Sequence, residues 1–474
     1  MRIDRNFANN EFLASDGEEL ITVLNPATGE PVAHAVAATA AEARSAVEAA
    51  AHAQKGWRKL TSIERANHLR ALADLLEERK DQIGKILALE SGKSLEDAAG
   101  EVFYAAEITR YHAEWARRIE GEIIPSDSPN ETLVLQREPI GVVAALIPFN
   151  FPVYTLMRKL APALITGNTV VARPSNNTPG SALEIARAVR DCGFPAGVIN
   201  ILAMTHEVAQ GVCTHPKVGM ITLTGSVGAG RKVLEYSQVN IAKVSLELGG
   251  KTPAIIEADA DLEAAAAAVI ASRTSHCGQL CTAVERVYVQ ESVHDKFVDL
   301  LRKHMNERAF GDRMREPSAM GPLINASSRL NIHQMVQRAI DDGAKLETGN
   351  FIPEGPGWFY PPTLLTNCRQ DMEIVQEEVF GPVLPVLKYD TIEEALELAN
   401  DHQFGLASVL YTENYRKAME VANNIEAGEL YINRTPADPF QGYHAGWKRS
   451  GLGGDDGKHG MLEFTQTRLV IQSW

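Results

Sequence analysis

The chain has 474 residues, of which 45% are hydrophobic and 23% charged. This length exceeds one ordinary core, so we predict two large domains, or two with a small appendage. Its 46 basic residues against 61 acidic ones give a formal charge of −15, which disfavours nucleic acid and anionic membrane surfaces as partners and favours small molecules.

Neither end of the chain nor its interior predicts a membrane protein. No apolar run approaches the roughly 18 residues of a membrane span. The opening stretch MRIDRNFANNEF lacks the apolar region of a secretory signal. We therefore expect a cytoplasmic protein.

The cysteines predict reduced thiols. An odd number scattered through a large chain argues against a disulfide framework, and no Cys/His spacing resembles a zinc site, so we expect no metal. The five are Cys192, Cys213, Cys277, Cys281 and Cys368.

The first hundred residues predict packing helices. Two of them begin with capping boxes, at Thr39 to Glu42 and at Thr61 to Glu64. A helical apolar stripe follows the second box, with charged residues on the wet face.

From Gly141 the chain changes to short β-rich runs separated by helix-length stretches. This rhythm predicts an α/β fold with a parallel sheet, whose ligands bind at the carboxyl ends of the strands. Beyond Lys251 a second α/β series runs to about Arg434, so we place a domain boundary near the pair Gly249-Gly250. The turns where chemistry is expected are 148–150, 173–176, 225–226 and 247–250.

One of the thiols stands in a context that favours chemistry. Gly278 and Gln279 precede Cys281 in a predicted loop, where the backbone can approach a ligand and the sulfur stays accessible. The other cysteines are interpreted as small buried hydrophobes, and Cys277 as a packing residue.

Four motifs in a fixed order extend this interpretation. IPFNFP, LTGSVGAG and LELGGK each end a predicted strand, and EEVFGP follows in the second half. Together with the cysteine loop they closely resemble the aldehyde dehydrogenase superfamily, from Asn25 to the stretch GKHGMLEFTQT near the end. AEWARRIEGEII and QGYHAGWKRSGLGG are most similar to its lactaldehyde and glycolaldehyde dehydrogenase branch.

The resemblance implies an architecture. A Rossmann-like parallel-sheet cofactor domain would comprise residues 1–119 and 140–249, and a second α/β catalytic domain residues 250–446. A small β oligomerisation element would comprise residues 120–139 and 447–474. An edge strand that needs a partner would make the protein a homodimer or homotetramer.

It also implies catalytic residues. Cys281 matches the family nucleophile, which forms a thiohemiacetal with the aldehyde. Asn150 matches the amide that stabilises the resulting oxyanion, and Glu247 matches the base that activates water to hydrolyse the thioester. Lys159 matches a lysine linked to proton relay, although a surface lysine on a helix is an alternative.

The cofactor residues implied by the resemblance favour NADP or NAD. Gly225, Ser226 and Gly230 match the pyrophosphate and nicotinamide end, and Glu378 and Phe380 match residues that hold the nicotinamide ribose. The further matching positions are Ile147, Phe149 and Leu248.

The adenosine end departs from the family pattern. Where a Lys-Pro-Ser-Glu is usual, the chain has Arg173, Pro174, Ser175 and Asn176. Loss of the glutamate removes a repulsion toward a 2′-phosphate, and an arginine fork suits phosphate. We therefore expect NADP to be accepted, with unchanged use of NAD as the alternative.

The substrate residues point to a polar aldehyde. Arg158 and His444 match positions that contact polar substrates in the lactaldehyde branch, and Thr282 and Asp438 replace an Asn and a Glu of that branch. We expect a hydroxylated aldehyde of the sugar or lactaldehyde type, oxidised to its carboxylic acid. The alternatives are a succinic semialdehyde-type dehydrogenase, a cofactor-independent cysteine hydrolase or acyltransferase, and a silent binding protein.

Overall fold

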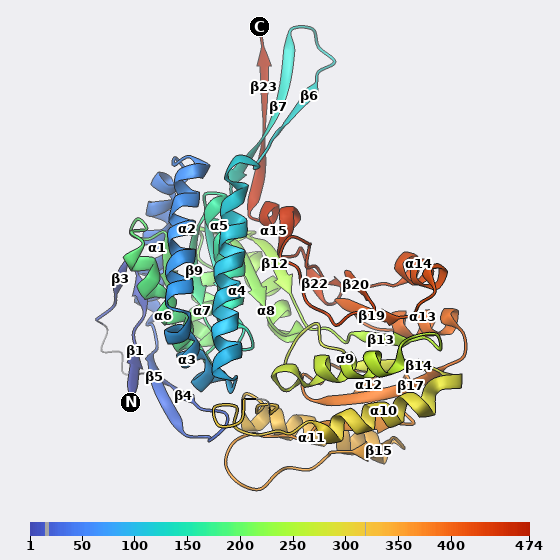
Figure 1. Cartoon of the computed structure of the whole chain (residues 1–474). Coiled ribbons are helices and arrows are strands. Elements are labelled where there is room, and N and C mark those ends of the chain that lie inside the picture. Colours follow the sequence, from blue (N-terminus) through green and yellow to red (C-terminus); the bar gives the residue numbers. More distant parts are fainter. Residues whose placement is uncertain (15–18, 318) are drawn as a thin grey trace.

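The computed structural model of the protein describes residues 1–14, 19–317 and 319–474 (Figure 1). Its larger sheet has eight strands in the order β22-β12-β11-β8-β9-β10-β2-β3. The five central strands are parallel: β8 (Val142–Leu146), β9 (Thr169–Arg173), β10 (Ile199–Ile201), β11 (Val218–Thr224) and β12 (Lys243–Glu247). The predicted parallel sheet after Gly141 is therefore confirmed. The edge strands β2 (Phe7–Ala8), β3 (Glu11–Phe12) and β22 (Gly451–Leu452) pair antiparallel.

Helices cover both faces of this sheet, because successive residues of a strand point to opposite sides. Val143 and Ala145 of β8 belong to one apolar core, and Val142 and Ala144 to another. The first core contains α2 (Ser62–Glu78), α3 (Lys80–Ser91), α4 (Leu95–Ala113), α5 (Pro152–Ile165) and α6 (Pro179–Asp191). The second contains α1 (Ala40–Trp57), α7 (His206–Cys213) and α8 (Val227–Asn240). Both predicted capping boxes are present, on α1 and α2.

The second sheet has seven strands in the order β15-β16-β17-β14-β13-β19-β20. All its pairs are parallel except that of β15 with β16. The strands are β13 (Pro253–Ile256), β14 (Arg286–Gln290), β15 (Lys345–Thr348), β16 (Thr363–Thr366), β17 (Val383–Tyr389), β19 (Ala407–Tyr411) and β20 (Glu429–Ile432). The associated helices are α9 (Leu262–Thr274), α10 (His294–Glu307), α11 (Ala326–Asp341), α13 (Ile392–Asn400) and α14 (Tyr415–Asn424).

The chain crosses from one sheet to the other between Glu247 and Pro253. The turns after β8, β9, β11 and β12 all lie at the carboxyl edge of the larger sheet, because these strands are parallel. The candidate residues on these turns are thereby brought to the side where the two sheets join.

Three strands form an arm that projects from the body of the molecule and carries the C-terminus (Figure 1). They are β6 (Glu122–Pro125), β7 (Glu131–Pro139) and β23 (Thr465–Ser473). The rest of the stretch 447–474 pairs elsewhere, since β21 (Trp447–Lys448) joins β18 (Phe404–Gly405) and β22 joins β12. The predicted element 447–474 therefore does not form a single unit, and the oligomeric role of the arm stays a prediction.

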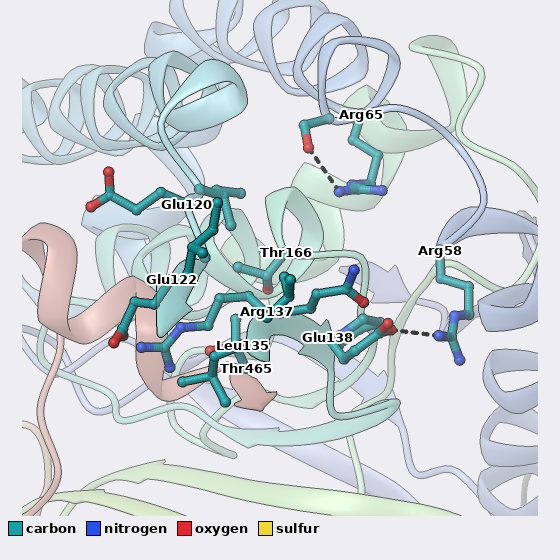
Figure 2. Close-up of a pocket in the computed structure, with 16 residues that line it drawn as sticks. Arg58, Arg65, Glu120, Glu122, Leu135, Arg137, Glu138, Thr166 and Thr465 are labelled. Atoms are coloured by element: carbon teal, nitrogen blue, oxygen red, sulfur yellow. Dashed lines mark hydrogen bonds and ion pairs between the residues drawn. The ribbon is translucent and has the colours of Figure 1, made fainter. Parts of the chain in front are cut away.

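A cavity of about 610 Å³ lies at the base of the arm (Figure 2). Its polar lining includes Arg65, Arg137 and Glu138, and Glu138 accepts a hydrogen bond of 2.6 Å from Arg58. None of the candidate catalytic residues lines this cavity. It belongs to the junction of the arm with α2.

The remaining elements are short. The strands β1 (Arg2–Asp4), β4 (Leu20–Leu24) and β5 (Pro31–Val36) form a three-stranded sheet. The short helices are α12 (Glu373–Gln376), α15 (Gly457–Glu463) and the 3-10 turns Glu114–Arg117, Ser275–Gly278 and Glu291–Val293. Among the described residues, no helix combines the length and the apolar character needed to cross a bilayer.

Candidate active site

Cys281 lies in the loop that follows α9, and this loop is held in an unusual conformation. Three consecutive residues, His276, Cys277 and Gly278, have φ values of 44°, 58° and 73°, a region that residues with a side chain seldom occupy. The buried guanidinium of Arg273 bonds the carbonyl of Gly278 and, at 3.0 Å, that of Val284. One arginine thus binds the loop on both sides of Cys281.

The segment that joins the two sheets, residues 248–252, packs against the same loop. A side-chain carbon on Gly250 would lie 2.7 Å from the carbonyl oxygen of Cys281, closer than real contacts allow. Gly250 also donates its N–H to Glu378 at 3.1 Å. Gly250 therefore lets the backbone of Cys281 approach the crossing segment, and Gly249 makes room in the same way for the Glu378 carboxyl group.

Cys277 is completely buried in an apolar core, and burial raises the pKa of its thiol. The predicted packing role of this residue is confirmed. Burial also raises the pKa of the Cys281 thiol, but His444 opposes that rise through a hydrogen bond and its positive charge. Cys281 therefore faces a charged group, His444, that favours its thiolate, whereas Cys277 lies in an apolar core.

Asn150 reaches the cysteine loop from the turn after β8. Its side-chain Nδ2 donates to the carbonyl of Gln279 at 3.0 Å, which leaves its second N–H free for another acceptor. The backbone oxygen of Asn150 accepts a hydrogen bond of 2.7 Å from Lys93. Lys93 is buried and paired with Glu101, which in turn caps the first turn of α5. This pair holds the Asn150 turn in place.

Glu247 ends β12 inside the protein, with 2% of its surface exposed. Neither oxygen of its carboxyl group has a hydrogen-bond partner within the described parts of the chain. Burial raises its pKa to about 8, although the positive charge of His444 lowers it. Nε2 of His444 lies 3.4 Å from Oε2 of Glu247. The carboxyl group is therefore poised to exchange a proton near neutral pH.

His444 is buried between acidic groups. Its Nδ1 lies 2.8 Å from Oε1 of Glu429 and 3.5 Å from Oδ2 of Asp438. Burial lowers the pKa of the imidazole, but Asp438, Glu247 and Glu429 together outweigh that effect and raise it well above its ordinary value. These acidic neighbours therefore favour the protonated, imidazolium form of the ring.

Two consecutive cations of α5 meet two consecutive acids from the end of the chain. Nζ of Lys159 lies 2.6 Å from Asp455, and Nε of Arg158 donates to Asp456 at 3.0 Å while its NH2 group bonds the second oxygen of the same carboxyl group. Lys159 is completely buried, so the alternative of a surface lysine is wrong. Burial raises the pKa of Asp456 to about 6, against the effect of Arg158.

The predicted cofactor residues lie along the turns after β8, β9, β11 and β12 and on the loop after α12. Ser226 caps α8 through the N–H of Ala229, and Gly230 lies in the first turns of that helix. Phe149 and Phe380 meet edge to face at 6.0 Å. The remaining predicted positions are Ile147, Ser175, Gly225 and Leu248, of which Ile147 donates its N–H to the carbonyl of Arg173.

The adenosine-end residues also come together. The guanidinium of Arg173 donates to Asn176 at 3.1 Å, whereas its Nε has no hydrogen-bond partner among the residues described. Burial lowers the pKa of Arg173, and its charge lowers the pKa of His206. This rim therefore carries an incompletely satisfied cation.

The described residues include one group with metal-ligand spacing. The side-chain atoms of Glu429, Asp438 and His444 lie within 4.8 Å of one another. The Arg158 guanidinium lies 3.7 Å from the Asp438 oxygen that also faces His444. The positive charges of Arg158 and His444 therefore already balance these carboxylates.

The predicted substrate residues lie near one another. Arg158 and His444 both face Asp438. Thr282 is buried and follows Cys281 directly in the chain.

Several residues of the site were not predicted from the sequence. Lys93, Glu429, Asp455 and Asp456 each contact a predicted residue, and Glu101 pairs with Lys93. The two adjacent acids of the stretch GGDDGKHG carried the clearest signal, because acidic residues between glycines are seldom needed for packing. The others resemble ordinary helix and strand charges.

A parallel sheet covered on both faces, with titratable groups at its strand ends, defines the class of α/β enzymes. Comparison with known proteins gives the family. The model of the aldehyde dehydrogenase family matches residues 12–470. The chain belongs to this family, as its motifs predict, and is an oxidoreductase rather than a cysteine hydrolase or acyltransferase.

Individual relatives match along nearly the full length. Lactaldehyde dehydrogenase of Escherichia coli (strain K12) is 45% identical over 98% of this chain and 97% of its own. A crystal structure of lactaldehyde dehydrogenase from Escherichia coli covers 100% of both chains with a TM-score of 0.98 at 44% identity. A 3,6-anhydro-alpha-L-galactose dehydrogenase of Vibrio sp. (strain EJY3) is 38% identical over 98% and 97%. A structure of 3,6-anhydro-L-galactose dehydrogenase in complex with NAP has a TM-score of 0.96 at 37% identity and covers 99% and 100%. The predicted fold class is confirmed.

Proposed function

We propose that the protein oxidises a hydroxylated aldehyde to its carboxylic acid, with NADP or NAD as the hydride acceptor. The observation that carries this proposal is the convergence of three groups on one pocket. Asn150 bonds the backbone of Gln279, two residues before Cys281, and His444 lies against both the Cys281 thiol and the buried carboxyl group of Glu247. The named activities of the lactaldehyde and anhydrogalactose dehydrogenases support the same substrate class.

The first step is addition of the Cys281 sulfur to the carbonyl carbon. The carbonyl oxygen becomes negative in the tetrahedral adduct and needs donors placed in advance. The free N–H of Asn150 and the backbone N–H of Cys281 supply them. The bond of Asn150 to Gln279 and its support by Lys93 fix the direction of that amide.

A bound nicotinamide supplies the acceptor for the hydride that leaves the adduct, and the product of that loss is a thioester on Cys281. Hydrolysis of the thioester requires a base close to it. The carboxyl group of Glu247 has no competing hydrogen bond among the described residues and a pKa near neutrality, so it can take a proton from water. The ion pair of Lys159 with Asp455 lies near enough for both charges to act on the pKa of Glu247.

The strand-end residues fit a dinucleotide. Ser226 and the first turn of α8 offer N–H groups to a pyrophosphate, and the Glu378 carboxyl group can accept hydrogen bonds from ribose hydroxyls. At the other end, the free Nε of Arg173 suits a phosphate, and Asn176 carries no negative charge to repel it. These features favour acceptance of the 2′-phosphate of NADP.

Arg158 favours a hydroxylated aldehyde over one that carries a carboxylate. Its guanidinium is bound on two atoms by Asp456, and Asp438 and Asp455 lie 3.7 Å away. A substrate carboxylate would have to compete with three acidic side chains for one cation. Hydroxyl groups can instead bond to Asp438 and His444 without added charge.

The arm supports association of copies of the chain. Ile123 is 80% exposed and Ile471 57%, and β6 and β23 are the edges of the arm sheet. Exposed apolar side chains on an unpaired edge favour pairing with a partner. We propose that the arm is the oligomerisation element, and that the larger sheet binds the cofactor while the second sheet carries Cys281.

The substrate class is tested by steady-state assays with lactaldehyde, glycolaldehyde, an anhydrohexose and succinic semialdehyde, each with NAD and with NADP. We expect a hydroxyaldehyde to give the highest kcat/KM, because Arg158 is already neutralised. A clear preference for succinic semialdehyde would show that Arg158 binds a carboxylate.

Replacement of the nucleophile should stop the reaction. Cys281→Ala removes the only atom that forms the adduct, so we expect no aldehyde oxidation above background and unchanged cofactor binding. Cys277→Ala is the matched control, since it deletes a buried thiol of the same loop and should retain turnover. Measurable oxidation by Cys281→Ala would refute the assignment.

Glu247→Gln should separate the two half-reactions. A glutamine cannot accept a proton, so we expect kcat to fall by about 10² to 10⁴ while the first turnover still yields a burst of reduced cofactor. The pKa of Glu247 is raised to about 8, so its basic form accumulates as pH rises, and wild-type kcat should increase between pH 7 and pH 9. The same pH profile in the glutamine variant would remove this role.

Asn176→Glu should restore preference for NAD. A carboxylate beside Arg173 repels a 2′-phosphate, so we expect the ratio of kcat/KM for NADP to that for NAD to fall at least about tenfold, equivalent to about 1.4 kcal/mol. Asn177→Glu places the same charge one residue away and serves as the control. An unchanged ratio would remove the argument from Arg173 and Asn176.

A further inference from the structure

The imidazole of His444 has the half-buried carboxylate of Glu429 on one side and the reactive groups on the other. Nδ1 lies 2.8 Å from Oε1 of Glu429, and Nε2 lies 3.4 Å from Oε2 of Glu247. The Cys281 thiol also contacts this ring, and the contact favours the ionised form of the thiol. His444 is therefore placed to act on both reacting groups at once.

Glu429 is itself held rigidly. It lies at the start of β20, and its Oε2 accepts a hydrogen bond of 2.7 Å from the hydroxyl of Tyr431 two residues along the same strand. The backbone of His444 is fixed as well, because its N–H and carbonyl pair with Asp455 at 3.0 and 2.8 Å. The orientation of the ring is thus determined by a strand and a short antiparallel bridge.

The charges around the ring come from four parts of the fold. Glu247 on β12, Glu429 on β20 and Asp438 in the loop that follows β20 are acidic, whereas Arg158 on α5 is cationic and opposes protonation of the ring. Cys281 is the fifth group that faces it. Glu429 makes the shortest of the three acidic contacts and lies on the side remote from Glu247.

We propose that Glu429 and His444 form a dyad that stabilises the thiolate of Cys281: Glu429 is a positioning residue that fixes the charged ring, and the imidazolium pairs with the negative charge. When Cys281 ionises, its S–H bond breaks and the proton passes to water. The sulfur then carries one negative charge, and the imidazolium is its counter-ion. No oxidant, reductant or further reactant is needed.

This inference rests on the proposed role of Cys281 as the nucleophile, but it concerns the ionisation of the thiol in the free enzyme rather than the turnover of aldehyde. A residue that only binds the substrate hydroxyl would not change the reactivity of the thiol in the absence of substrate. Alkylation of the free enzyme by iodoacetamide therefore tests the dyad directly, since only the thiolate reacts. Aldehyde oxidation by Cys281→Ala tests the nucleophile separately.

The rate of alkylation is measured against pH on the full-length enzyme without aldehyde or cofactor. Mass spectrometry of the tryptic peptide 274–286, with fragment ions that separate Cys281 from Cys277, gives the rate at Cys281 alone. We expect His444→Gln and Glu429→Gln each to move the midpoint upward by about one unit or more, equivalent to about tenfold slower alkylation at neutral pH. The double variant should be no slower than His444→Gln, because Glu429 acts through the ring.

Glu413→Gln is the matched control, because it removes an exposed carboxylate in the turn between β19 and α14, and it should keep the wild-type profile. Thermal melts establish that each variant is folded. Should Glu429→Gln not fold, His444→Gln decides alone: a raised midpoint supports the dyad, and a wild-type midpoint overturns it. A raised midpoint in His444→Gln with a wild-type midpoint in a folded Glu429→Gln would overturn the role of Glu429.

Discussion

Exclusion of water from a single group of charges is the constraint on which the site depends. Glu247 and His444 are almost completely buried, and Lys159 is completely so. Buried charges are costly unless each finds a partner, and here every cation contacts a carboxyl group. The raised pKa of Glu247 is therefore a property of this pocket rather than of the residue alone, and a change in one member alters the charge state of the others.

Residues from both sheets form that pocket. Parallel strands of the larger sheet deliver Asn150 and Glu247 to one edge, while β20 of the second sheet brings Glu429 from the opposite side. Cys281 lies between them on a loop whose carbonyl groups bond Arg273 and whose backbone packs against Gly250. The catalytic distances thus depend on how the sheets meet.

Prediction from the sequence was successful where chemistry follows local order. The strands after Gly141 and the capping boxes are local patterns, and both are present. The family motifs are local too and led to Cys281, Asn150 and Glu247, whose catalytic roles stay predictions. The partners of these residues were missed because contacts such as Lys159 with Asp455 join residues 296 positions apart, and no local pattern encodes them. The direction of each pKa shift likewise depends on burial, which no spacing reveals.

The late position of Asp455 and Asp456 in the chain has a consequence for biosynthesis. Arg158 and Lys159 enter the interior on α5, yet the carboxyl groups that neutralise them follow 298 and 296 positions later. During translation the growing chain must carry two cations without counter-ions at the centre of its first large core. The core around α5 therefore cannot reach its native charge pairing until Asp455 and Asp456 have been synthesised, and β23 then completes the arm.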